Sequence, residues 1–264
     1  MEINKKVKII NYNKEFLKYK SFLDNLSTFS CYEHTIETSF ESLKDWSLFY
    51  NIDQIKDWFV KKKEQLKIQI QEIDINEMRN WKVEKKSGNI IHESKDFFLI
   101  RGLRVEVDTR ESQGAWDQPI VEQIGYDGGI LGIIRKRFSG VPHYLCEAKF
   151  EPGNYGLLQI SPTLQATFSN LKRKHKGRKP YFSDYFENIG DKTDVKILYD
   201  SWLAEDGGRL YKKRNRGMLV ELPGTHEISL PNDNFCWLSL YQIKQLLKEN
   251  SWINPHIRGI IAHT

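Results

Sequence analysis

The residues between positions 141 and 175 bring acidic, basic and imidazole side chains together in one short stretch. Hydropathy alternates with a period of two over 141–151, which predicts a β-strand. Its apolar face would carry Tyr144, Cys146, Ala148 and Phe150, and its polar face His143, Glu147, Lys149 and Glu151. An imidazole, two carboxylates and an ammonium on one face could carry out general acid–base chemistry. A plain ion pair between Glu147 and Lys149 on a solvated sheet face is the alternative.

A polar helix is expected beyond this strand, after a turn at 152–154. Apolar residues at 164, 168 and 171 predict a helix that reads 163–175, with Ser161 as its N-cap and Pro162 at its first position. The remaining side chains of this helix are mostly uncharged and suited to hydrogen bonding. His175 at its end could act as a base or simply interact with the helix dipole.

Composition limits the class of protein. The chain has 264 residues, enough for one large domain or a domain with an attached subdomain. Its 40 basic and 35 acidic residues leave a charge of +5, which is weak support for nucleic-acid binding. Cys31, Cys146 and Cys236 have no close spacing and suggest reduced thiols. Without a signal peptide or a long apolar run, we expect a cytoplasmic protein with no membrane segment.

Periodicity divides the chain into two regions. Residues 1–80 show helical spacing and predict a helical N-terminal extension. From Trp81 onward the period is mostly that of strands, beginning with a hairpin over 81–93, and helices are expected after Ser239 and Asn254. Strands around one helix, with helices at both ends, predict the α+β class, and residues 81–264 are expected to form the main domain.

Several common site types are not supported by any motif. The seven histidines show no HxH or HxxxH spacing and there is no CxxC, so no metal site is expected. The chain also lacks a phosphate-binding lysine loop, a GxGxxG motif and the Gly-x-Ser-x-Gly of a nucleophile elbow. We therefore expect neither nucleotide hydrolysis nor a nicotinamide cofactor.

Longer motifs resemble one known family. The segments that carry the resemblance are Gly88-Asn-Ile-Ile-His-Glu-Ser-Lys-Asp-Phe-Phe98, Trp116-Asp-Gln-Pro-Ile120, Gly129-Ile-Leu-Gly132, Glu147-Ala-Lys-Phe-Glu-Pro-Gly-Asn154, Gln159-Ile-Ser-Pro-Thr-Leu-Gln-Ala-Thr-Phe-Ser-Asn170, Lys213-Arg-Asn-Arg-Gly-Met218 and Phe235-Cys-Trp-Leu-Ser239. In this order they resemble the NDP-hexose 2,3-dehydratase family, from about Trp58 to the C-terminus. Two segments depart from the family pattern, at Ala204-Glu-Asp-Gly207 and at Gly217.

The resemblance implies a Nudix-like fold, a mixed sheet with packed helices, that has lost the glutamate-rich hydrolase motif from 153–175. It also implies a dehydratase that removes water across C2 and C3 of a nucleotide-linked 4-keto-6-deoxyhexose, commonly the dTDP form. The product would be a 3,4-diketo-2,6-dideoxy sugar, which an NADPH-dependent 3-ketoreductase must capture. Family members usually carry two such modules, so a single module suggests a homodimer.

Placed on this chemistry, the residues fall into a few roles. Glu147 or Glu151 would be the base, Lys149 would stabilise the enolate, and His143 or His175 would be the acid. Arg214 and Arg216 would bind the diphosphate, with Lys172 or Arg178 as helpers. Trp81 or Trp116 would stack on the thymine ring of the nucleotide. The remaining candidate substrate ligands are Gln118, Gln159, Ser161, Gln165, Thr167, Ser169, Asn170, Glu205 and Asn215.

Two other functions compete with this one. A module of a tandem pair could bind the nucleotide sugar without turning it over. A basic nucleic-acid binder using 172–179 and 212–216 would need aromatic platforms and a larger charge excess. The intact acid–base residues of 147–151 favour the enzyme.

Overall fold

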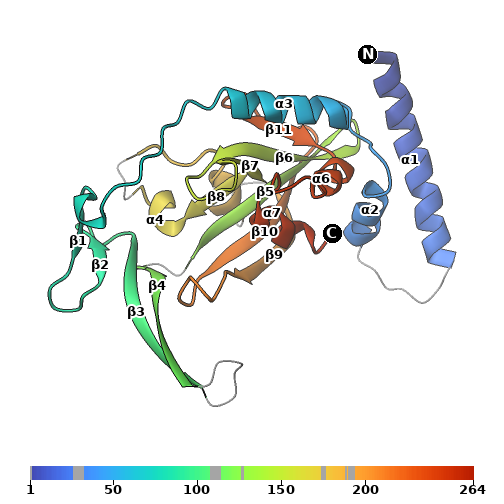
Figure 1. Cartoon of the computed structure of the whole chain (residues 1–264). Coiled ribbons are helices and arrows are strands. Elements are labelled where there is room, and N and C mark those ends of the chain that lie inside the picture. Colours follow the sequence, from blue (N-terminus) through green and yellow to red (C-terminus); the bar gives the residue numbers. More distant parts are fainter. Residues whose placement is uncertain are drawn as a thin grey trace.

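A seven-stranded mixed sheet forms the centre of the protein, as the computed structural model in Figure 1 shows. The structure describes residues 2–25, 33–107, 114–125, 128–173, 177–187, 189 and 194–264. The strand order is β11-β6-β5-β10-β9, with β7 paired to β6 and β8 paired to β5. The strands are β5 (Gly129–Phe138), β6 (Val141–Phe150), β7 (Leu158–Pro162), β8 (Leu164–Thr167), β9 (Lys196–Ala204), β10 (Arg214–Leu222) and β11 (Phe235–Leu238). With helices on both faces, the predicted α+β class is confirmed.

The central strands β5 and β6 separate half-way along their length. They pair from Phe138–Val141 as far as Ile134–Leu145, after which β6 continues with β7 and β5 with β8. Thr163, between β7 and β8, fills the point of separation. Its hydroxyl donates to the carbonyl oxygen of Leu145 at 2.5 Å and accepts from the amide of Ile134 at 2.9 Å. This hydroxyl satisfies backbone groups that the divergence leaves without a ladder partner.

Each face of the sheet has its own core and its own helices. On one face, α3 (Ile52–Glu64), α6 (Leu240–Leu246) and α7 (Pro255–Ile261) bury their apolar side chains against β5, β6 and β7. On the other, α4 (Phe168–Leu171) and α5 (Asp184–Glu187) contribute Leu171 and Phe186 to a second cluster with Ile134 and Met218. The short α7 begins at an Asn254 cap and a proline at its first position, as the sequence predicted.

The N-terminal region has the predicted helices only as far as Glu64, with α1 (Glu2–Asn25) and α2 (Glu33–Glu41) beside the sheet. An aromatic cluster of Tyr12, Phe40 and Trp46 packs around Val141 of β6. Beyond α3 the chain carries only the short 3-10 helix η1 (Ile75–Glu77) before β1. Because α3 shares a core with the sheet, the domain boundary at residue 80 stays a prediction.

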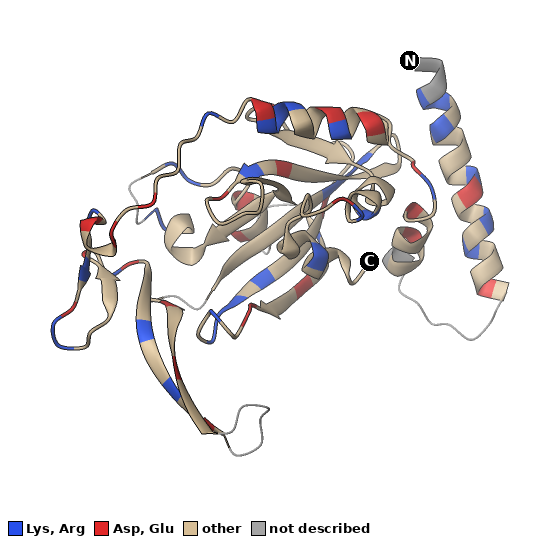
Figure 2. Cartoon of the chain, in the orientation of Figure 1, with Lys and Arg blue, Asp and Glu red and all other residues tan. Residues whose placement is uncertain are grey.

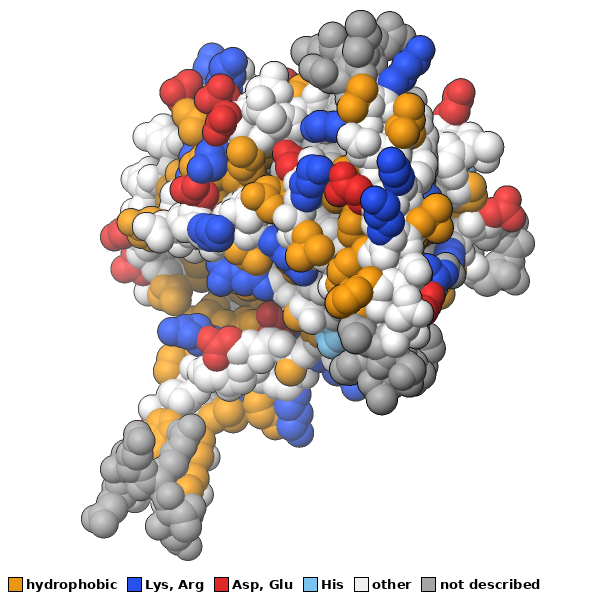
Figure 3. Space-filling model, turned by 90° about the vertical axis from the view of Figure 1, so that its right-hand side faces the viewer, with side chains coloured by type: hydrophobic (Ala, Val, Ile, Leu, Met, Phe, Trp, Pro, Cys, Tyr) orange, Lys and Arg blue, Asp and Glu red, His pale blue; other side chains and the backbone are white. Residues whose placement is uncertain are grey.

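A second sheet, of order β1-β2-β3-β4, extends away from the body. It comprises β1 (Trp81–Val83), β2 (Ile90–His92), β3 (Phe98–Val107) and β4 (Gly114–Gln123). The long hairpin of β3 and β4 forms an arm that stands clear of the main sheet in both Figure 1 and Figure 3. The hairpin predicted over 81–93 is confirmed by the pairing of β1 with β2.

The prediction of a helix over 163–175 is wrong for residues 163–167. Residues 164–167 are the strand β8, and α4 begins only at Phe168. Pro162 ends β7 opposite Cys146, a position where a strand tolerates proline, and Thr167 rather than Ser161 caps the helix. Leu164 and Ala166 are buried through strand alternation, so the apolar spacing did not indicate a helix.

No helix in the described part of the chain combines the length and apolar character needed to cross a bilayer.

Candidate active site

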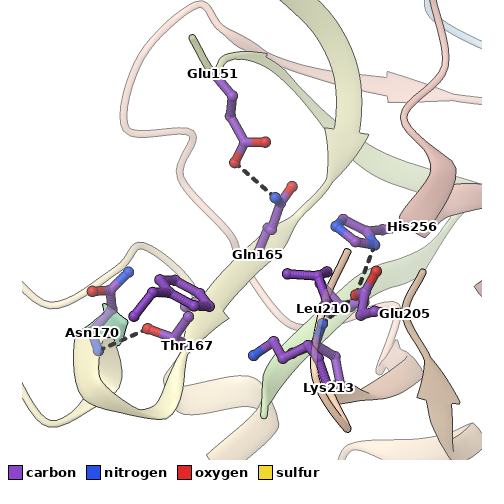
Figure 4. A pocket seen from close by; sticks show the side chains of 12 residues that line it. Glu151, Gln165, Thr167, Asn170, Glu205, Leu210, Lys213 and His256 are labelled. Atoms are coloured by element: carbon purple, nitrogen blue, oxygen red, sulfur yellow. Dashed lines mark hydrogen bonds and ion pairs between the residues drawn. The ribbon is translucent and has the colours of Figure 1, made fainter. Parts of the chain in front are cut away.

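A cavity of about 270 Å³ lies where β8, β10 and α7 come together with the base of the β3–β4 arm. Leu131, Leu210, Ala166 and Phe98 provide its apolar lining. The polar side chains that line it are Glu151, Gln165, Thr167, Asn170, Glu205, Lys213, Asn215 and His256 (Figure 4). Two carboxylates, an ammonium and an imidazole around one small cavity form a set suited to proton transfer.

Gln165 of β8 connects two charged residues at one side of this cavity. Its side-chain nitrogen Nε2 donates to Glu151 Oε1 at 2.8 Å, and its backbone carbonyl oxygen accepts from Lys149 Nζ at 3.1 Å. The register pairs Gln165 with Leu131, a residue of the first core. Gln165 Oε1 is buried and has no partner among the described residues. An acceptor left in this state costs free energy until a ligand donates to it, so it can bind a substrate hydroxyl.

Glu205 is held at the opposite side of the cavity by two neighbours. Its backbone amide donates to the carbonyl oxygen of Lys213 at 3.1 Å, and its side chain accepts a hydrogen bond from Asn215 Nδ2. The imidazole of His256 faces the same carboxylate, with Nδ1 3.6 Å from Glu205 Oε1 (Figure 4). Asn215 lies in β10, and Glu205 lies just after the neighbouring strand β9. Strand alternation places both side chains on the same face of the sheet, the face that α7 covers.

Charge and burial set the protonation of His256. Burial lowers its pKa, and the carboxylates of Glu205 and Glu151 only partly oppose this effect. The ammonium groups of Lys149 and Lys213 lower the pKa further. The imidazole is therefore neutral at pH 7, which leaves one of its nitrogens free to accept a proton.

Comparison with known sequences identifies the family. Residues 52–264 match the sequence profile described as NDP-hexose 2,3-dehydratase. This chain belongs to the NDP-hexose 2,3-dehydratase family. Every residue that lines the cavity falls inside the matched region.

Three relatives share the name dTDP-4-dehydro-6-deoxy-alpha-D-glucopyranose 2,3-dehydratase. The chain is 36% identical to the protein of Amycolatopsis orientalis over 80% of its own length and 44% of the relative's. It is 38% identical to that of Saccharopolyspora spinosa over 72% and 37%, and 37% identical to that of Streptomyces violaceoruber over 78% and 44%. The chain thus spans less than half the length of these relatives.

One solved structure, described as an Ap4A hydrolase of C. elegans, is similar over 52% of this chain and 95% of its own, with 11% identity and a TM-score of 0.31. A TM-score of 0.31 is too low to assign a shared fold, so the Nudix-like character of this 2,3-dehydratase family member stays a prediction.

The predicted polar face of β6 divides into separate environments in this family member. The strand and its alternation are confirmed, and Glu151 lines the cavity with Lys149 bound beside it. Glu147 is half-buried and lies outside the cavity, and burial raises its pKa more than Lys149 lowers it.

His143 is fully buried at the other end of β6, away from the cavity. Its Nε2 accepts from the amide of Leu48 at 3.0 Å, and its ring packs between Phe49 and Phe138. Period-two alternation could not show that the segment around Leu48 covers this end of the strand. His143 therefore has a structural role, and its prediction as the catalytic acid is wrong. The other predicted acid, His175, lies outside the described residues.

The predicted substrate ligands are also divided by the fold. Gln165, Thr167, Asn170, Glu205 and Asn215 line the cavity. Gln159, Ser161 and Ser169 are buried close by but outside its lining. Gln159 donates to the carbonyl oxygen of Ser251 and accepts from Asn254, while Ser169 pairs with Thr167.

The two predicted arginines point away from the cavity. In β10 they alternate with Asn215 and share the face of Met218, on the far side of the sheet. Arg214 stacks on Trp202 with 4.4 Å between its guanidinium carbon and the ring centroid. Arg216 pairs with Asp200, with Nε 2.7 Å from Oδ1. The exposed helpers Lys172 and Arg178 also lie outside the cavity lining.

The aromatic candidates lie elsewhere as well. Trp81 lines a separate depression with Met78, and Trp116 sits on the arm, where its Nε1 donates to Gln118 at 2.9 Å. Gln118 in turn donates to the carbonyl oxygen of Gly208 at 3.0 Å. The aromatic ring that lines the cavity is instead that of Phe98.

Two residues that supply acid–base groups to the cavity, Lys213 and His256, were not predicted. Lys213 opens the basic motif from which only the arginines and Asn215 were chosen. His256 follows the cap at Asn254 and Pro255. This pattern predicted the start of a helix but gave no sign that His256 belongs to the site. Its partner Glu205 is 51 positions away and meets it only through the fold.

Proposed function

We propose that this protein removes water across C2 and C3 of a nucleotide-linked 4-keto-6-deoxyhexose, as the names of its relatives describe for the dTDP form. The observation that carries the proposal is the cavity itself. It brings a neutral imidazole, two carboxylates and an ammonium together within the region that matches the family.

The chemistry needs only proton transfer and charge stabilisation. The C4 ketone acidifies the hydrogen on C3, so a base breaks this C–H bond and its electrons form an enolate. The C2–O bond then breaks, the departing hydroxyl takes a proton, and water leaves. The resulting enol takes up a proton at C2 and becomes the 3,4-diketo-2,6-dideoxy sugar. C3 is oxidised and C2 is reduced within the same sugar, so the reaction needs no external oxidant or nicotinamide. We propose that lysines rather than a metal stabilise the enolate, and EDTA should leave the rate unchanged.

The cavity can stabilise the enolate through its lysines. Lys213 lines the cavity, and Lys149 is fixed beside it by the carbonyl oxygen of Gln165. An ammonium placed where negative charge develops lowers the barrier without further reorganisation. Gln165 Oε1, Thr167 and Asn170 are placed to bind hydroxyl groups of the hexose.

The size of the cavity separates sugar from nucleotide. Sites for drug-sized ligands begin at about 300 Å³, so 270 Å³ suits one sugar ring rather than a whole nucleotide sugar. The diphosphate and base would lie outside it, where Arg214 and the exposed Lys172 can still contribute charge.

A non-catalytic binding module is the second candidate, because the chain spans less than half the length of its relatives. We prefer the enzyme because the acid–base groups are present in the cavity. As a partner we propose a second copy of the chain, which light scattering would test. The basic side chains do not favour nucleic acid, since Figure 2 shows them interspersed with acidic ones along α1 and α3.

Mass spectrometry of the reaction with dTDP-4-keto-6-deoxyglucose tests the proposal, with and without an NADPH-dependent 3-ketoreductase. We expect a product lighter by one water, which accumulates as a stable reduced sugar when the reductase is present. Tight binding with no change in mass would instead establish a binding module.

A further inference from the structure

His256 is held in place by hydrogen bonds at the start of α7. It follows the cap of α7, and its backbone amide donates to Asn254 Oδ1 at 2.9 Å. The side-chain amide of Asn254 donates to Gln159 Oε1 at 3.1 Å, and Gln159 Nε2 donates to the carbonyl oxygen of Ser251 at 3.0 Å. Asn254 and Gln159 are both buried. This chain of hydrogen bonds fixes the start of α7, so the imidazole has a defined direction into the cavity (Figure 4).

Glu205 faces one particular nitrogen of that imidazole. The 3.6 Å between Glu205 Oε1 and His256 Nδ1 is longer than a hydrogen bond, but catalytic contacts often tighten when substrate binds. Asn215, a buried residue of β10, donates to the same carboxylate and keeps it in place. A carboxylate at Nδ1 favours the tautomer with the proton there, which leaves Nε2 unprotonated.

We propose that His256 is the base that removes the C3 proton through Nε2, and that Glu205 is the positioning residue that orients and stabilises it. The inference rests on the proposed function. It replaces Glu147, which lies outside the cavity, and it leaves Glu151 as the competing base.

Glu151 is less suited to this step because its carboxylate already accepts from the amide of Gln165 at 2.8 Å. Removing a proton with that carboxylate would weaken this hydrogen bond as its charge is lost. In contrast, the imidazolium that forms on His256 gains an attraction to Glu205 and Glu151. The other charged groups that act on the ring are Lys149 and Lys213, both placed to stabilise the enolate rather than the imidazolium.

The same imidazole can complete the elimination. The relatives' substrate has the gluco configuration, in which the C3 hydrogen and the C2 hydroxyl lie on the same face of the ring. His256 Nε2 takes the C3 proton, the electrons of the C–H bond pass to the ketone oxygen, and the enolate forms. As the C2–O bond breaks, the imidazolium returns its proton to the departing hydroxyl, and neutral His256 is restored with one water released.

His256→Gln tests the base, because it keeps a polar group near Nε2 and removes basicity. In deuterated water we expect exchange of the C3 hydrogen and formation of product both to fall by roughly 100- to 10,000-fold. The Kd of the nucleotide sugar should stay close to that of wild type. His263→Gln is the matched control, since His263 stacks on Tyr199 outside the cavity, and it should exchange and eliminate normally.

Glu205→Gln tests the positioning role through the pH profile. Loss of the carboxylate lowers the pKa of the imidazole, so the acidic limb of kcat should move to lower pH while kcat itself falls. A purely structural role would lower activity without moving that limb. Thermal unfolding of each variant shows whether it is folded, and His256→Asn provides a second variant at the same position.

The outcomes separate this inference from the proposed function. Normal exchange in folded His256→Gln or His256→Asn, with exchange lost in Glu151→Gln, would overturn the assignment and leave the dehydratase in place. Wild-type protein that exchanges the C3 hydrogen through His256 but releases no water would support the base and refute the dehydratase. An acidic limb that stays fixed in Glu205→Gln would refute the positioning role.

Discussion

Arg135 and Glu41 form an ion pair that is almost completely buried, with 2.6 Å between Arg135 Nη2 and Glu41 Oε1 and side chains that are 1% and 3% exposed. The same guanidinium also contacts Glu37 at 2.7 Å and Glu221. The pair joins α2 to β5, so it connects the N-terminal helices, which precede the family-matching region, to the central sheet. The cost of burying these charges makes the network sensitive to loss of one partner.

Arg135→Ala should therefore destabilise the protein strongly. It leaves the carboxylate of Glu41 buried without its cation and Glu37 with Arg137 as its remaining cation, and breaking such a network costs about 3–5 kcal/mol in free energy of unfolding. Urea denaturation followed by circular dichroism would measure the loss. Arg104→Ala removes an exposed ion pair with Asp117 on the arm and should change stability little. Equal effects of the two variants would contradict the structural role of the network.

Stability should fall as His143 becomes protonated. Burial lowers the pKa of this imidazole to about 4, whereas in the unfolded chain it would be near 6.5. A group whose pKa is depressed on folding stabilises the protein fully above the unfolded value. That contribution, on the order of 3 kcal/mol, is lost as the pH falls from about 6.5 to about 4. His143→Gln keeps an acceptor for the amide of Leu48 but does not titrate, so its stability should depend less on pH in this range. An unchanged dependence would assign the acid sensitivity to other groups.

Gln165→Leu should weaken substrate binding. It keeps the size of the side chain but removes both the free acceptor and the donor to Glu151. An unmade hydrogen bond at a buried site costs about 1–3 kcal/mol, or roughly five- to 150-fold in Kd or KM. Titration calorimetry with the nucleotide sugar measures the change, and Gln71→Leu, at an exposed position, is the control. An unaltered Kd would show that Gln165 faces no substrate hydroxyl.

Arg214 and Lys213 should affect different kinetic constants although they are neighbours. The diphosphate is proposed to lie outside the cavity beside Arg214, so Arg214→Ala should mainly raise KM through a lost phosphate contact worth about 1.5–3 kcal/mol. Lys213 lines the cavity, so Lys213→Met should mainly lower kcat through loss of enolate stabilisation. Steady-state kinetics of both variants would measure this split. The reverse pattern would exchange their roles.

Local patterns in the sequence predicted what depends on near neighbours. The strand at β6 followed from period-two alternation, which Leu145 interrupts, and the start of α7 followed from Asn254 and Pro255. The helix over 163–175 failed because the hydroxyl of Thr163 replaces backbone hydrogen bonds between two distant strands. Such a role depends on where β5 and β6 separate, which no local period shows.

The site was predictable only in part for the same reason. Gln165, Glu151 and Lys149 are close in sequence, with a turn and the strand β7 between them, and each was a predicted site residue. Glu205, which directly follows β9, and His256 of α7 approach each other only when the sheet is complete. His143 shows the converse, because it shares a strand with Glu151 yet is enclosed by an N-terminal segment.

Proton NMR of dTDP-4-keto-6-deoxyglucose mixed with the purified chain in deuterated water tests the central claim most directly. We predict that the C3 hydrogen signal disappears, that the C2 hydroxyl is lost, and that C2 becomes a methylene carrying deuterium from the solvent. A spectrum of bound sugar in which the C2 and C3 signals stay unchanged would contradict the proposal that this cavity removes water across C2 and C3.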